Sequence, residues 1–141
     1  MTYNSNHIEG SRLSEDQTRL IFETKTIDAP EGVPVDDVIE TVNHFRAVDR
    51  VIDHAEDPLS EECIKELHRI LKQGTSDSDL AWFAVGDYKR RPNVIGGRET
   101  AKPQEVSSRM QALLSDYESL DDVTIDEIIW FHYEFENIHP F

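Results

Sequence analysis

The sequence predicts a mainly α-helical bundle that carries one short β-hairpin, and three observations support this fold class. Five segments place apolar residues at the three- and four-residue spacing of an amphipathic helix. Each has such a stripe or a start signal, and Gly or Pro follows several of them. Residues 82–97 differ, because aromatic and β-branched side chains flank a basic turn, which is typical of a hairpin.

Local signals bound the predicted helices. Ser14 with Gln17, and Thr124 with Glu127, have the spacing of a capping box, in which side chains and backbone amides satisfy each other. Pro140 disfavours helical geometry at the residue before it and so ends the last helix. The expected helices cover residues 14–26, 36–54, 60–73 and 124–139, and a further helix begins near Pro103 with an apolar stripe that reaches Tyr117.

The composition indicates one globular domain. Apolar residues make up 38% of the 141 residues and charged residues 30%. The formal charge of -15 opposes binding to a nucleic-acid backbone, and no apolar run reaches the roughly 18 residues of a membrane helix. The polar first residues and the single cysteine, Cys63, favour a cytoplasmic protein without an internal disulfide. Trp82 and Trp130 are expected to be packing residues.

The first segment whose side chains could take part in a reaction is residues 5–10. Ser5 and Glu9 are four residues apart and would share one face of a short helix, which Gly10 would end. Glu9 would then lie in the last turn, where the helix dipole disfavours an anion, and this suggests a cationic partner elsewhere. A frayed polar terminus is the alternative interpretation.

The second segment is residues 86–97. It contains the one tight basic cluster of the sequence, Lys89, Arg90 and Arg91, followed by Val94 and Ile95. A hairpin with unpaired backbone groups can add a strand to an extended peptide, so this segment is a candidate peptide-binding flap. The alternative is an ordinary surface hairpin.

The third segment is His139-Pro140-Phe141. An unperturbed neutral imidazole, with a pKa of ~6.5, can take a proton from a hydroxyl. Pro140 would hold the His139 ring in one orientation. The alternative is a helix-terminal histidine that the dipole favours. His132 and Glu136 share a helix face, but no third side chain completes a zinc set, so no metal site is predicted.

Taken together, these three segments resemble the Fic (Fido-domain) family of protein adenylyltransferases, and they come in the family's order. The matching segments are residues 4–13 for the inhibitory motif, 86–97 for the target-binding flap, and 132–141 for the run-up to a signature that opens with His-Pro-Phe. The resemblance implies an inhibitory helix segment in residues 1–13 and a Fic-type helical core with a hairpin flap in residues 14–141.

The resemblance also implies an activity. Fic enzymes transfer AMP from ATP, with magnesium, to a Ser, Thr or Tyr hydroxyl of a target protein. The implied residues are His139 as general base, Pro140 and Phe141 as the loop anchor, Asn93, Val94, Ile95 and Gly96 along the flap, and Ser5, Glu9 and Gly10 in the inhibitory motif. Glu9 would reach an arginine of the signature and displace the γ-phosphate of ATP.

The family signature continues with an acidic residue, glycines, an asparagine and arginines, whereas this sequence stops at Phe141. We therefore expect a truncated Fic domain without its carboxy-terminal helices, inactive alone, whose complete form binds ATP and Mg²⁺. A target protein is the expected partner, and a homodimer is a further candidate. The alternatives are a non-enzymatic protein-binding remnant and a complete protein that removes AMP.

Overall fold

The computed structural model describes residue 4 and residues 11–24 and 33–141, and within them the predicted helical fold class with a small hairpin is confirmed. The elements are α2 (Glu15–Thr24), α3 (Val35–Asp53), α4 (Glu61–Lys72), the 3₁₀ turn η1 (Ser76–Asp79), β1 (Val94–Ile95), β2 (Arg98–Glu99), α5 (Pro103–Glu118) and α6 (Ile125–Ile138). The predicted start of every helix, and the predicted ends of the second, third and fifth, lie within two residues of their observed positions. The predicted end of the first helix, at residue 26, lies outside the described residues.

Capping residues explain this agreement. The Ser14 N–H donates to Gln17 Oε1 at 2.9 Å, and the Gln17 N–H donates back to Ser14 Oγ at 3.2 Å. Thr124 and Glu127 make the same reciprocal pair at the start of α6. Each pair satisfies backbone donors that lack an intrahelical partner, so a few local residues set where these helices begin.

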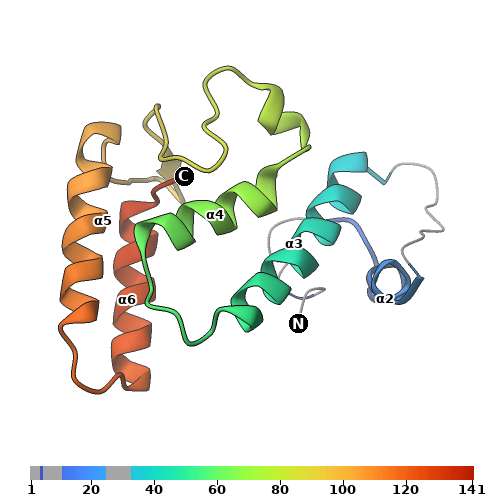
Figure 1. Cartoon of the computed structure of the whole chain (residues 1–141). Helices are drawn as coiled ribbons and strands as arrows, with labels where there is room; N and C mark the ends of the chain where they lie inside the picture. Colours follow the sequence, from blue (N-terminus) through green and yellow to red (C-terminus); the bar gives the residue numbers. More distant parts are fainter. Residues whose placement is uncertain (1–3, 5–10, 25–32) are drawn as a thin grey trace.

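The helices form a continuous row in space. Figure 1 shows α5 and α6 side by side and antiparallel, with α4, α3 and α2 following toward the other side of the molecule. The buried core lies between α4, α5, α6 and the loop before α5; its members are Ile64, Tyr88, Ala101, Val106, Met110, Leu113 and Ile138. Figure 1 also places the carboxyl end of the chain beside the hairpin, above the α5–α6 pair.

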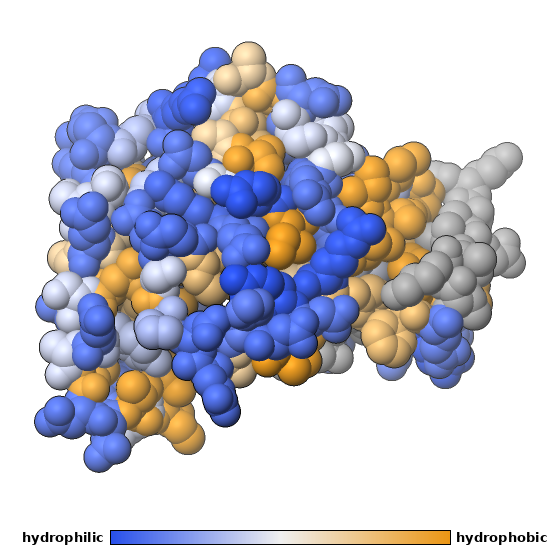
Figure 2. Space-filling model, in the orientation of Figure 1, coloured by the Kyte–Doolittle hydropathy of each residue, from blue (hydrophilic) through white to orange (hydrophobic). Residues whose placement is uncertain are grey.

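Not every apolar side chain is covered. Figure 2 shows apolar side chains at the surface near the lower end of the α5–α6 pair, and Val123, Ile125 and Ile128 are among the exposed large apolar residues. Trp82 and Trp130, which are expected to be packing residues, are 41% and 38% exposed, so they pack at the surface and not in the buried core. Within the part of the chain described, no helix is long and apolar enough to cross a membrane.

A buried polar side chain joins α3 to α4. Asn43 is only 2% exposed. Its Nδ2 donates to the carbonyl oxygens of Leu71 and Gln73 at 3.0 and 2.9 Å. These carbonyls lie at the end of α4, where the helix offers no amide partners. Asn43 therefore caps α4 from the neighbouring helix.

We expect Asn43→Ala to lower the free energy of unfolding by about 1–3 kcal/mol, because two partly buried hydrogen bonds at the end of α4 are lost. Urea unfolding followed by circular dichroism measures this loss. Gln111→Ala, on an exposed position of α5, is the control and should change stability by less than about 0.5 kcal/mol. Equal effects of the two substitutions would contradict the capping role of Asn43.

Candidate functional site

The hairpin is smaller than the predicted flap. Val94 pairs with Glu99 and Ile95 with Arg98, in antiparallel register. Gly96 and Gly97 form the turn with φ of 57° and 79°. Two central residues with positive φ are typical of the tight turns that suit hairpins, and glycine adopts them without strain. The hairpin thus covers residues 94–99, and residues 82–93 form an irregular loop that leads into it.

The predicted flap residues lie at and beyond the base of this hairpin. Val94 and Ile95 are exposed, at 61% and 49%. Gly96 occupies the turn. Asn93 precedes β1 and points back toward the end of the chain, where its Nδ2 donates to the Phe141 carbonyl oxygen at 3.1 Å. Asn93 therefore connects the flap to the His-Pro-Phe segment.

His139 ends α6 in an uncommon backbone conformation. Its φ of 44° and ψ of 71° lie in the left-handed region, which a non-glycine residue rarely occupies. Its N–H donates to the Phe135 carbonyl oxygen at 2.8 Å, which closes the last turn. The side chain is 34% exposed, and its Nδ1 lies 4.0 Å from Glu136 Oε2. The imidazole is thus accessible to a hydroxyl group from solvent.

The two residues after His139 are anchored. Pro140 is fully buried, and its carbonyl oxygen accepts from the Lys89 N–H at 2.8 Å. The Phe141 ring stacks on the His68 ring, with centroids 4.0 Å apart and an angle of 13° between the planes. The structure therefore brings four of the predicted site residues together, namely Asn93, His139, Pro140 and Phe141.

Sequence reasoning missed His68. It is 8% exposed on α4, and its Nδ1 accepts from the Gly86 N–H at 3.0 Å. Burial lowers the pKa of His68 to about 4, so the ring is neutral at neutral pH. Its position one turn after Ile64, on the apolar face of α4, is the signal that could have revealed a buried histidine.

Gly86 fits this contact because it has no side chain. Its φ is +75°, and a Cβ there would lie 2.8 Å from Arg69 Nε and 2.9 Å from Arg69 Cβ. Only glycine lets the loop approach α4 closely enough for the hydrogen bond to His68. His68 therefore supports both the loop before the flap and the ring of Phe141.

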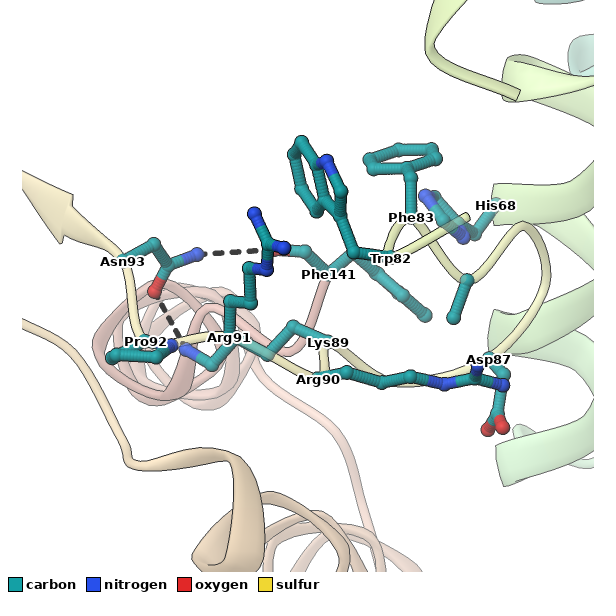
Figure 3. A pocket seen from close by; sticks show the side chains of 11 residues that line it. His68, Trp82, Phe83, Asp87, Lys89, Arg90, Arg91, Pro92, Asn93 and Phe141 are labelled. Carbon is teal, nitrogen blue, oxygen red and sulfur yellow. Dashed lines mark hydrogen bonds between the residues drawn. The ribbon is translucent and has the colours of Figure 1, made fainter. Parts of the chain in front are cut away.

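A cavity of about 330 Å³ lies beside these residues. Figure 3 shows His68, Phe83 and Phe141 on one part of its wall, and Arg91 near Trp82 on another. The Arg91 guanidinium lies 4.8 Å from the centre of the Trp82 ring, within the range of a cation–π contact. Trp82 thus lines a cavity that also carries cationic side chains.

The inhibitory residues Ser5, Glu9 and Gly10 lie outside the described residues. Over residues 4, 11–24 and 33–141, no three His, Cys, Asp or Glu side chains are grouped closely enough to hold a metal ion. The magnesium expected from the family resemblance therefore has no ligand set in these ranges.

The geometry defines a helical domain in which a partly exposed histidine at a helix end is fixed beside the base of a hairpin. The model of the Fic/DOC family matches residues 58–141, which is more than half of the chain. The chain therefore belongs to the Fic/DOC family. No functionally curated protein matches it.

Solved structures agree with this assignment. A Fic domain containing signaling protein from Bacteroides thetaiotaomicron VPI-5482 is 30% identical, with a TM-score of 0.80 over 99% of this chain. A Fic family protein from Desulfovibrio desulfuricans G20 (23% identity, TM-score 0.80) and Fic-1 from C. elegans (21%, 0.77) also match over 99% of this chain, and these two show the fold alone. The chain spans 54%, 41% and 41% of these three proteins.

The buried His68 predicts an acid-sensitive stability. As pH falls from 6.5 to 4, the unfolded chain binds a proton at His68 that the folded chain excludes, so stability should decrease. A pKa that is lowered from 6.5 to about 4 corresponds to about 3 kcal/mol once protonation is complete. His68→Asn keeps an acceptor near the Nδ1 position but does not titrate, and should flatten this slope in urea unfolding.

His132→Asn, at an exposed position of α6, is the matched control for this prediction. It should keep the slope of the parent chain between pH 6.5 and 4. The burial of a neutral His68 would be contradicted if His68→Asn and His132→Asn gave the same dependence of stability on pH.

Proposed function

We propose that this chain provides the catalytic base and the flap of a Fic-type transferase that moves AMP from ATP to a Ser, Thr or Tyr hydroxyl of a target protein. The observation that carries this proposal is the placement of His139. It combines a partly exposed imidazole with a backbone whose next two residues are anchored on the flap loop. A general base needs both access to the hydroxyl and a fixed orientation.

In the proposed reaction, the target hydroxyl oxygen attacks the α-phosphorus of ATP. An imidazole nitrogen of His139 takes the hydroxyl proton as the new oxygen–phosphorus bond forms. The bond between the α-phosphorus and the bridging oxygen of pyrophosphate breaks, and pyrophosphate leaves with that electron pair. Such a base typically contributes about 10²–10⁴ to the rate.

The hairpin supports a role in holding the target. In the described part of the chain β1 pairs only with β2, so each strand retains an outer edge. An extended segment of the target can add to such an edge through main-chain hydrogen bonds. Because Asn93 at the base of β1 contacts Phe141, a segment bound there would lie near His139.

The basic side chains of the neighbouring loop favour an anionic substrate at this end of the molecule. Arg90 and Arg91 are exposed and line the cavity next to Phe141. The chain as a whole carries a formal charge of -15 and would repel a nucleotide at long range. A local pair of guanidinium groups offsets this repulsion where the phosphates of ATP would approach.

The proposed activity is tested with ATP that is labelled at the α-phosphate, using the longest gene product that carries these residues and a lysate as the source of targets. His139→Ala should reduce label transfer to protein by about 100-fold or more, because the hydroxyl loses its base. His132→Ala, also on α6 and exposed, should transfer label like the parent protein. Equal transfer by both variants would refute the assignment of His139.

We further propose that Glu9 restrains this activity, on the basis of the Ser5, Glu9 and Gly10 pattern. Glu9→Gly should then increase label transfer in the same assay, because a carboxylate no longer competes with the γ-phosphate of ATP for a cation. Glu56→Gly, in an exposed turn after α3, is the control and should leave transfer unchanged. Unchanged transfer by Glu9→Gly would count against an inhibitory role.

A further inference from the structure

Lys89 holds an ammonium group among uncharged oxygen atoms. Its Nζ donates to Asn93 Oδ1 and Thr100 Oγ1, each at 2.7 Å, and to the Ile138 carbonyl oxygen at 3.1 Å. An ammonium group has three N–H donors, so these three acceptors match its full capacity. Figure 3 shows Lys89 reaching toward Asn93 at the edge of the cavity.

This environment distinguishes Lys89 from other lysines of the described residues. Lys65 binds the carboxylates of Glu61 and Asp87, and Lys72 binds Glu40. Lys89 is half-buried, and desolvation lowers its pKa to about 8. Removing a cation from water without pairing it with a carboxylate lowers the stability of the folded state. A general stabilising role therefore does not explain the position of Lys89.

The acceptors of Lys89 lie in three separate parts of the chain. Asn93 precedes β1, Thr100 follows β2, and Ile138 ends α6. The Lys89 ammonium therefore joins both ends of the hairpin to the end of the helix that carries His139.

Lys89 also contacts both residues that flank His139 in the sequence. Its Nζ binds the carbonyl oxygen of residue 138, and its backbone N–H binds the carbonyl oxygen of residue 140 at 2.8 Å. His139 between them has the left-handed conformation that non-glycine residues disfavour. Such a conformation persists only where the surroundings fix it, and Lys89 supplies contacts on both sides.

We propose that Lys89 is a positioning residue that fixes the backbone around His139 and couples it to the flap. This inference rests on the proposed function of His139 as the base. Lys89 touches neither the hydroxyl nor the nucleotide in this scheme. It sets the direction of the imidazole relative to a target bound along the hairpin.

The test uses Lys89→Met, which keeps the length of the side chain but removes the donors, and Lys89→Arg, which restores a cationic donor. Lys102→Met, at an exposed lysine, is the matched control. The first readout is NMR of the 141-residue chain. An intense nuclear Overhauser effect between the amide and α protons of His139 marks its positive φ.

We expect Lys89→Met to lose this signal and to speed amide exchange at Ile95 and Arg98, whereas Lys89→Arg and Lys102→Met retain both features. If Lys89→Met keeps the signal and the slow exchange, the positioning role is overturned. If Lys89→Met fails to fold, Thr100→Val removes one acceptor only; faster exchange in the hairpin supports the proposal, and unchanged exchange overturns it.

The second readout is kinetic, in the gene product that transfers label. Lys89→Met should lower kcat about 10- to 100-fold, since misorientation of a catalytic group has this order of effect, while KM for ATP changes little. Lys89→Arg should recover part of the loss. If the parent protein transfers no label, the proposed function fails, yet the NMR result still decides whether Lys89 positions His139.

Discussion

Lys89 donates to the carbonyl oxygens of Ile138 and Pro140, the residues on either side of His139, and the arrangement of the site depends on these two hydrogen bonds. They hold the end of α6 against the loop that leads into the hairpin. Because Asn93 on that loop contacts both Lys89 and Phe141, the flap and the histidine segment form one connected unit. A shift of either part would be transmitted to the other, and this is how a flap can orient a substrate relative to a base.

The packing below this unit also holds the loop before the hairpin in place. Phe141 stacks on a neutral His68, and His68 accepts the N–H of Gly86 in the loop that precedes the hairpin. The loop is thus attached to α4 at Gly86 and to the end of α6 at Lys89. The neutral form of His68 suits this position, because a buried imidazolium would need a counterion.

Local signals made the helices predictable. The Ser60 and Thr124 side chains accept hydrogen bonds from backbone amides at the start of α4 and α6. Pro103 suits the first turn of α5 because it has no N–H that would lack a partner there. The His-Pro-Phe segment was also predictable, since the family resemblance rests on adjacent residues. These features depend on residues only a few positions apart, so they can be recognised directly in the sequence.

The supporting contacts were not predictable, because they join distant residues. Asn43 reaches carbonyls 28 and 30 residues away, and His68 meets Gly86 18 residues further along the chain. Lys89 was grouped with Arg90 and Arg91 as one basic cluster, although it turns inward to Ile138, 49 residues away, while the arginines are exposed. Composition cannot separate neighbours whose side chains leave the backbone in different directions.

The most direct measurement uses the longest gene product that carries these residues. It compares the transfer of label to protein from ATP labelled at the α-phosphate with the transfer from ATP labelled at the γ-phosphate. A base that activates a hydroxyl against the α-phosphorus gives protein that carries the α-label and none of the γ-label, since pyrophosphate retains the latter. Transfer of the γ-label, or of neither label, would contradict the account of this chain as part of an AMP transferase.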